Sequence, residues 1–144
     1  MAPMDDLRQT IDKTAAALNY VASGDPEPYK ALWSHRQDVT LFGGFGGYAL
    51  GWDQVSENTD WAASLFRGAK SYGVEMLVEG ASGELGYTIS IERGEVRVEG
   101  RDDYAPLVVR VTHIYRREEG VWKIIHRHGD PVAARTEATA ILHR

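Results

Sequence analysis

Two histidines near the carboxyl end are the residues best suited to chemistry. β-Branched and aromatic residues from Val121 to His128 predict a strand. Because side chains alternate between the faces of a strand, His126 and His128 are expected on the same face as Trp122 and Ile124. An imidazole titrates near neutral pH and can act as acid, base or hydrogen-bond donor in a partly buried pocket. Both histidines are therefore predicted as catalytic residues, with a purely structural role as the alternative.

A metal site is not expected from these histidines. The His-x-His spacing matches a pair of zinc ligands, but a zinc site needs a third and a fourth ligand. His35 and His113 could contribute only if the fold brought them close, and no cluster of carboxylates accompanies the pair. The chain also has no cysteine, which removes thiolate ligands and disulfides. We predict no metal and no cofactor.

Arg110 is a candidate ligand anchor. It shares one face of a predicted strand with Thr112 and Ile114, and an arginine among apolar residues is costly to bury without a negative partner. A small carboxylate-bearing ligand would supply that partner. The alternatives are a salt bridge to an acidic residue such as Glu92 or Asp130, or exposure at the edge of the strand.

The tryptophans of the first half of the chain are candidate walls for an apolar ligand. Trp33, Trp52 and Trp61 all fall in segments predicted as helical, and aromatic side chains commonly line ligand clefts. They are equally the usual contents of a core in a small domain. The glycine-rich segment 43–47 is not a phosphate loop, because no Lys-Ser/Thr pair follows it.

Three helices are expected ahead of the strands that carry the histidines. Apolar residues recur every three or four positions from Asp5 to Ala22, which predicts an amphipathic helix. A second, short helix is expected from Pro26 to Trp33, and a third from Gly51 to Leu65. Between them, Val39–Phe42 is of strand type, and the glycines of segment 43–47 predict a sharp bend.

The second half of the chain reads as antiparallel strands joined by short turns. Helices followed by strands indicate an α+β fold, whose sheet must curve or be covered to bury its apolar face. We expect one domain over residues 1–144, with a core at about 5–132 and a tail at 133–144 that could form a frayed helix. The predicted strands are Ser71–Glu79, Gly86–Arg93, Glu95–Glu99, Leu107–Arg117 and Val121–His128, with a tight turn at Glu118–Gly120.

Composition narrows the classes of partner. The 144 residues include 43% hydrophobic and 26% charged residues, as in ordinary globular proteins. A net charge of -5 disfavours binding to nucleic acid. No stretch has the apolar length of a secretory signal or a membrane span. A cytoplasmic protein without nucleic-acid or membrane partners is the expectation.

Three parts of the sequence together resemble SnoaL-like proteins, which belong to the ketosteroid-isomerase-related group of the nuclear-transport-factor-two-like superfamily. The likeness covers about residues 5 to 132. It rests on Ala31–His35 running into Asp38–Gly43, on Gly86–Thr88 with Glu92–Gly94, and on Arg110–His113 through Trp122–His128. The resemblance implies a cone-shaped, strongly bent antiparallel sheet wrapped around amino-terminal helices, a pocket at its open end, and homodimers.

The resemblance does not by itself choose a reaction, because the superfamily includes isomerases, cyclases, dehydratases, epoxide hydrolases and non-catalytic association domains. It places the catalytic tyrosine and aspartate of ketosteroid isomerases at Ala17 and Gly43. Neither residue can transfer protons, although Tyr20 lies one turn away, so whether the chain is an enzyme is left open. The first hypothesis is a domain with an enclosed apolar pocket for a small apolar or carboxylate-bearing molecule, acting as an isomerase, lyase or hydrolase through its histidines. The alternative is a non-catalytic dimerisation or ligand-sensing module.

Overall fold

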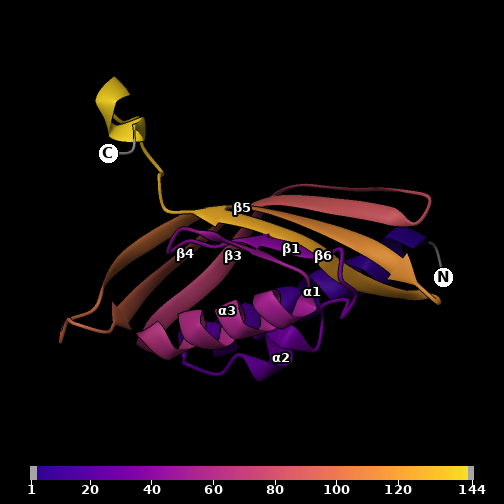
Figure 1. The fold of residues 1–144 in the computed structure, drawn as a ribbon, viewed down its shortest axis with the longest axis horizontal. Helices are drawn as coiled ribbons and strands as arrows, with labels where there is room; N and C mark the ends of the chain where they lie inside the picture. The colour runs from indigo at the N-terminus through magenta and orange to yellow at the C-terminus, as the bar shows by residue number, and fades with distance from the viewer. Residues whose placement is uncertain (1–2, 143–144) are drawn as a thin grey trace.

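The computed structural model describes residues 3–142 and has an α+β architecture in which a curved sheet lies over helices (Figure 1). The predicted fold class is therefore confirmed. In chain order the elements are α1 (Pro3–Ala22), α2 (Glu27–Lys30), β1 (Thr40–Phe42), β2 (Tyr48–Leu50), α3 (Trp52–Leu65), β3 (Phe66–Ser82), β4 (Leu85–Val98), β5 (Ala105–Glu118), β6 (Val121–Asp130) and the 3-10 helix η1 (Ala138–Ile141).

The two long helices form where apolar periodicity predicts them. In α1, Leu7, Ile11 and Leu18 are buried in the core beneath the sheet, as their spacing requires. In α3 the buried stripe is Val55, Thr59 and Ala63. The predicted stripe on α3 included Trp61, which is wrong: Trp61 is 48% exposed.

The predicted second helix is too long. It ends at Lys30, and Trp33 instead forms an isolated parallel bridge with Ile124 of β6. Ser34 then donates a backbone hydrogen bond to Ile124, and Ile124 donates one to Leu32. This segment is therefore held to the sheet by the backbone, which side-chain periodicity does not reveal.

The sheet has six strands in the order β2-β1-β6-β5-β4-β3. Neighbouring strands are antiparallel except β1 and β6, which are parallel, with Thr40 opposite His126 and Phe42 opposite His128. The sheet is thus mixed, and the expectation of a wholly antiparallel sheet is wrong. Alternation of side chains predicts that a segment is a strand, but it does not show whether the neighbouring strand is parallel or antiparallel.

The number and extent of the strands also differ from the sequence prediction. β2 was not predicted, and the segments predicted as 86–93 and 95–99 fall in one continuous strand, β4, which ends at Val98. Gly94 lies inside β4, where a Cβ atom would come within 2.6 Å of the carbonyl oxygen of Ser71. This glycine permits a close approach of two backbones rather than a turn. The predicted turn before β6 is confirmed, since Glu119 and Gly120 both have positive φ, as in a type I′ hairpin.

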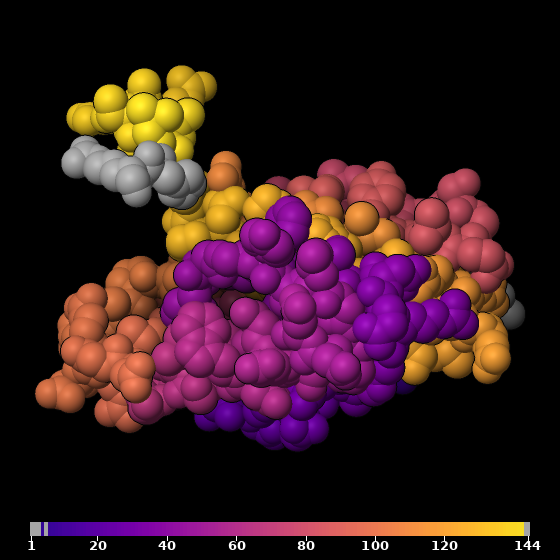
Figure 2. Space-filling model, in the orientation of Figure 1, coloured from indigo at the N-terminus to yellow at the C-terminus, as the bar shows by residue number. Residues whose placement is uncertain are grey.

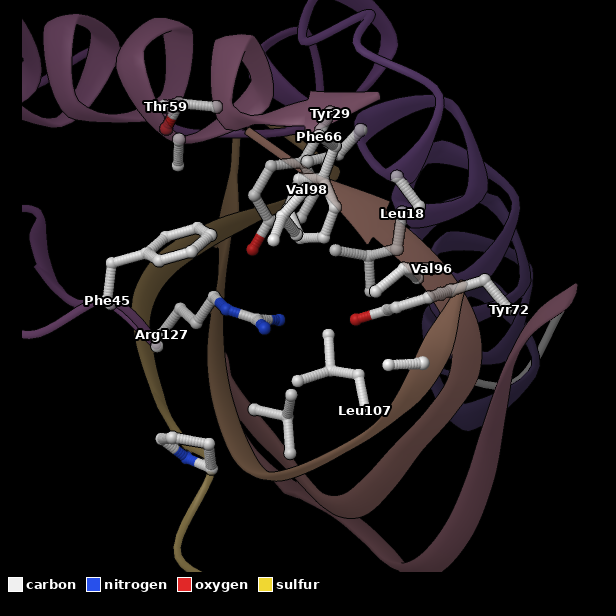
Figure 3. A pocket seen from close by; sticks show the side chains of 18 of the residues that line it. Leu18, Tyr29, Phe45, Thr59, Phe66, Tyr72, Val96, Val98, Leu107 and Arg127 are labelled. Atoms are coloured by element: carbon white, nitrogen blue, oxygen red, sulfur yellow. The ribbon is translucent and has the colours of Figure 1, made fainter. Parts of the chain in front are cut away.

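Bulges interrupt the pairing in places that matter for the site. In the β5–β6 pair, Ile114 lies opposite His126, but the next residue, Tyr115, lies opposite Ile124. Ile125 is therefore the extra residue of a β-bulge, and the alternation of faces is reset at this point. The β3–β4 pair contains further register shifts. Such irregularities help a sheet to bend, and Figure 3 shows the strands curving around the cavity described below.

The carboxyl-terminal tail takes little part in this arrangement. Figure 1 shows the η1 turn standing away from the sheet, and residues 138–141 are the only helical part of the predicted tail within the described chain. The last part of that predicted tail, residues 143–144, lies outside the described residues. Among residues 3–142, no helix is both long and apolar enough to cross a membrane.

Candidate functional site

The concave side of the sheet and the helices enclose a cavity of about 330 Å³. Its mouth opens between the β1–β2 loop and α3, where the surface is hollowed (Figure 2). A volume of this size lies at the lower end of the range of small-molecule pockets, about 300–1,000 Å³. The walls are mostly apolar and include Leu18, Phe45, Phe66, Val96, Val98 and Leu107 (Figure 3).

The inner end of the cavity carries a buried ion pair. Both terminal nitrogens of Arg127 donate to the carboxylate of Glu92, at 2.7 and 3.0 Å. The Glu92 side chain is 0% exposed and that of Arg127 is 11% exposed. The hydroxyl of Tyr72 donates to the same carboxylate. A bidentate pair with an added donor is the geometry that makes a buried charge tolerable.

Glycine 129 gives the arginine the space it needs on the inner face of the sheet. A Cβ atom at Gly129 would lie 3.1 Å from a terminal guanidinium nitrogen of Arg127 and 3.2 Å from a methyl group of Val109. Both contacts are tighter than ordinary packing allows. The absence of a side chain at Gly129 therefore leaves room for the Arg127 guanidinium, which bonds to Glu92 on β4.

A second polar pair joins the ion pair at the cavity. The hydroxyl of Tyr29, from α2, lies 2.8 Å from Nε2 of His113 on β5. Figure 3 shows Tyr29, Tyr72 and Arg127 with their polar ends directed into the cavity. The site therefore combines one guanidinium and two phenolic hydroxyls, supplied by α2, β3 and β6, inside apolar walls.

Burial sets the protonation of these groups. It raises the pKa of Tyr29 to about 12, although the charge of Arg127 opposes that shift. Burial and then the charge of Glu92 raise the pKa of Tyr72. Burial and then Arg127 lower the pKa of His113 well below its usual value. Burial also works against the charge of Arg127, but Glu92 raises the pKa of the guanidinium well above its usual value.

These directions define the charge of the site near neutral pH. Both tyrosines are protonated and His113 is neutral, because burial penalises every charged form that lacks a partner. Arg127 keeps its charge because Glu92 faces it. The polar end of the cavity can therefore donate and accept hydrogen bonds, and it carries almost no net charge.

The predicted histidine pair lies on the other face of the sheet, so the predicted orientation of His126 and His128 is wrong. Trp122 and Ile124 do face the core, but the bulge at Ile125 reverses the alternation after them. His126 contacts the hydroxyl of Thr40 at 2.7 Å. His128 lies 3.8 Å from Asp130 with its side chain half exposed. Neither histidine lines the cavity, and their predicted catalytic role stays untested.

The predicted ligand-binding residues also lie away from the cavity lining. Trp33 is fully buried and contacts the Tyr29 ring edge-on at 6.0 Å, so it supports the site from behind. Trp52 stacks on His35 at 3.9 Å. Trp61 reaches the cavity only through Phe45, whose ring lies 5.7 Å away.

Arg110 has a protein partner and an exposed side chain. It donates to both carboxylate oxygens of Asp130, at 2.9 and 3.0 Å. This is one of the salt bridges that the sequence offered as an alternative to a ligand contact. Within residues 3–142 there is also no group of three or more potential metal ligands among His, Asp and Glu.

The positions that correspond to the isomerase catalytic pair do not supply chemistry. Ala17 is buried in the core, and Gly43 lines the cavity without a side chain. Tyr20, the possible substitute on α1, is 54% exposed and does not line the cavity. Tyrosines do reach the cavity, but from α2 and β3 rather than from α1.

Sequence reasoning did not assign to the site Tyr29, Tyr72 and Arg127, which line the cavity, or Glu92, which pairs with Arg127. A signal for Glu92 was available in β4, where Thr88, Ser90 and Glu92 alternate with Tyr87, Ile89 and Ile91. Period two places these three polar residues on one face, and that face is the buried one. A charged residue on a buried strand face requires an oppositely charged partner, which points to an arginine elsewhere in the sheet.

Solved structures with the same fold include a protein of the nuclear transport factor 2-like superfamily. One match is a nuclear transport factor 2-like superfamily protein from Salmonella enterica, 14% identical, covering 93% of each chain with a TM-score of 0.73. Another is a ketosteroid isomerase-like protein from Erwinia carotovora, 14% identical, covering 90% of this chain and 96% of that one with a TM-score of 0.74. A third match is a protein with a cystatin-like fold from Caulobacter vibrioides. It is 16% identical and covers 95% of this chain and 92% of that one, with a TM-score of 0.66.

At these identities the likeness concerns the fold alone. The sequence itself gives a narrower assignment, because residues 8–134 match the SnoaL-like domain. The protein therefore belongs to the SnoaL-like domain family. A comparison with curated proteins finds no significant match.

Proposed function

We propose that this SnoaL-like domain binds a small, largely apolar and uncharged molecule, whose single polar group hydrogen-bonds with Arg127, Tyr29 and Tyr72. The observation that carries the proposal is the compensated ion pair at the end of an apolar cavity. Apolar walls with a few convergent polar groups are typical of ligand sites. The walls favour an apolar body, and the polar end fixes how that body is oriented.

The charge balance argues for an uncharged ligand. Glu92 already neutralises Arg127 through two hydrogen bonds, and Tyr72 adds a third donor to Glu92. A ligand carboxylate would bring a second negative charge beside a buried one, and the other cation among the described lining residues, Arg101, is already paired with Asp103. A hydroxyl or carbonyl oxygen meets the remaining guanidinium N–H groups and the phenolic oxygens without that cost.

Catalysis by general base is less well supported than binding. Both oxygens of Glu92 already accept hydrogen bonds from Arg127 and Tyr72, and Asp103, the carboxylate among the described lining residues, is paired with Arg101. The Tyr29–His113 pair is the observation that favours proton transfer, since a neutral imidazole can exchange a proton with a phenol. An isomerase or lyase acting through Tyr29 is therefore the second candidate for this cavity.

Paired ligands of one shape test the charge argument. In a thermal-shift experiment, 2-naphthol is expected to raise the melting temperature of the protein, because a ligand selective for the folded state stabilises it. The anion 2-naphthoate, with the same ring system, is expected to leave the melting temperature unchanged at the same concentration. Stabilisation by 2-naphthoate alone would refute the uncharged-ligand proposal, and stabilisation by neither would count against an apolar ligand site.

A cavity-filling substitution tests the location. Leu107 points into the cavity (Figure 3), so Leu107→Trp is expected to occupy the space and to weaken binding of 2-naphthol at least tenfold by isothermal titration. Val108→Trp is the matched control, because neighbouring residues of a strand face opposite sides. Binding that is equally weak in both variants, or unaffected in both, would show that the ligand binds elsewhere.

We further propose that the outer face of the sheet pairs with a second copy of the chain. Cross-strand register places one row of residues across all six strands. The row runs Tyr48, Phe42, His128, Thr112, Ile89 and Val78. Tyr48, Phe42, Ile89 and Val78 are large and exposed. Large apolar residues gathered on an exposed sheet face are typical of surfaces that another protein covers.

A charge placed in this row is expected to prevent assembly. Ile89→Lys should convert a dimer into a monomer in analytical ultracentrifugation, because an unpaired ammonium group would be buried at the centre of the interface. Ile141→Lys, at an exposed position on η1, is the control and should leave the dimer intact. A wild-type chain that sediments as a monomer at high micromolar concentration would contradict the proposal.

A further inference from the structure

A second and much smaller cavity lies between α1 and the inner face of β3, β4 and β5. It is separate from the ligand cavity but shares Leu18 with it. Within it the centre of a water molecule has about 10 Å³ to occupy, which is about what one bound water requires. The space is too small for any organic ligand, so it is either empty or filled by water.

The polarity of the lining argues that this cavity is not dry. Cavities of this size stay empty when their walls are apolar, and they hold water when two to four polar groups converge. The lining mixes apolar residues, among them Ile11, Leu18, Val74 and Met76, with the polar residues Thr88, Ser90, Glu92 and His113. The four polar residues are all buried.

Some polar groups around the small cavity are already hydrogen-bonded within the protein, and the others are available to a water molecule. The hydroxyl of Thr14 is satisfied, since it donates to the carbonyl of Thr10 at 2.8 Å and accepts from Tyr115 at 3.0 Å. Nε2 of His113 is occupied by Tyr29. Tyr29 is the one hydrogen-bond partner of the His113 ring among residues 3–142, so Nδ1 is available to a water that enters the cavity.

Glu92 can accept one more hydrogen bond. Its two oxygens receive three, from two nitrogens of Arg127 and from Tyr72. An ionised carboxylate offers about four acceptor sites. A water that donates to Glu92 therefore completes the carboxylate at the same time as it serves the imidazole.

We propose that the small cavity holds one water molecule, hydrogen-bonded to the carboxylate of Glu92 and to Nδ1 of His113. Thr88 and Ser90 supply its remaining partners. The water joins two pairs that otherwise only lie near each other, giving a continuous chain from Glu92 through the water and His113 to the hydroxyl of Tyr29. The orientation of the His113 ring, and through it of Tyr29, is then set from the buried carboxylate.

Such a chain makes His113 a positioning residue for the ligand cavity. His113 does not line that cavity, yet it fixes the hydroxyl that does. Internal waters with three or more partners behave as part of the structure and are costly to remove. The water site does not depend on any ligand. The water proposal can therefore be refuted while the ligand proposal stands, and the ligand proposal can be refuted while the water proposal stands.

A crystal structure of the unliganded protein at about 1.5 Å resolution tests the proposal. The expected result is a density peak at hydrogen-bond distance from both a Glu92 oxygen and Nδ1 of His113. An empty cavity in such a map, with both side chains placed as described here, would overturn the proposal.

A filled cavity provides the second test. Ser90→Val adds methyl groups in place of the hydroxyl, and it is expected to expel the water and to shift the ring ¹⁵N resonances of His113. Thr112→Val, on the outer face of β5, is the control and should leave those resonances unchanged. Thr88→Val replaces a partner of the water with a group of similar shape and serves if Ser90→Val does not fold. His113 resonances that are the same in the folded cavity variant and in wild type would contradict the link between the water and the imidazole.

Discussion

Replacing Arg127 with methionine is expected to lower the free energy of unfolding by about 3–5 kcal/mol, because the substitution leaves a buried carboxylate without its cation. Glu92 is fully buried, and both of its oxygens depend on the guanidinium. The remaining donor, Tyr72, can satisfy only one of them. Urea denaturation at pH 7 measures the loss directly.

Two further variants distinguish the effect of the unpaired Glu92 carboxylate from the effect of lost side-chain packing. Arg127→Met combined with Glu92→Gln removes the charge as well, and it is expected to recover part of the lost stability. Arg93→Met is the surface control, because Arg93 pairs with Glu75 on the exposed side of the sheet, where ion pairs contribute little. Equal losses for Arg127→Met and Arg93→Met would show that the buried pair does not have the role described.

Acidification is expected to destabilise the protein through His113. Burial lowers the pKa of His113 well below its usual value in the folded protein, whereas the unfolded chain binds a proton near pH 6.5. Below that pH the unfolded state holds more protons, so the free energy of unfolding falls as pH falls. The contribution of one such histidine amounts to about 1 kcal/mol between pH 7 and 5.5.

The pH dependence can be assigned with two substitutions. His113→Gln should be less stable at pH 7, yet it should lose about 1 kcal/mol less than wild type on going to pH 5.5. Burial and then the nearby His128 also lower the pKa of His126, so His126→Gln should reduce the acid loss by a smaller amount. An acid loss that is unchanged by His113→Gln would contradict the burial argument. Chemical denaturation at each pH measures all three proteins.

The fold could be predicted from the sequence because its local signals agree with the final structure. Leu7, Ile11 and Leu18 recur at helical spacing on α1, and Glu119-Gly120 is a turn that needs positive φ at both residues. What the sequence could not provide was the pairing of strands distant along the chain. The parallel pair of β1 and β6 joins residues more than 80 positions apart, and no local pattern specifies such a partner.

The site was harder to predict because it depends on one irregular residue. Side chains alternate between the two faces of β6 on each side of Ile125, but the alternation shifts by one residue at Ile125. Trp122 and Ile124 therefore face the core as expected, while His126 does not. The tyrosines were hidden for a different reason. Tyr29 lies on a helix of four residues, too short for a periodic signal, and Tyr72 lies on a strand with register shifts on both sides of it.

The bulge in β6 also determines how this chain should be compared with its relatives. A related chain that lacks one residue near Ile125 would turn its equivalent of Arg127 toward solvent and its flanking histidines toward the interior. Two homologues could then share the letters His-Arg-His while presenting opposite chemistry to a ligand. An alignment that matches those letters without locating the gap would equate residues on opposite sides of the molecule, and would transfer a function to the wrong surface.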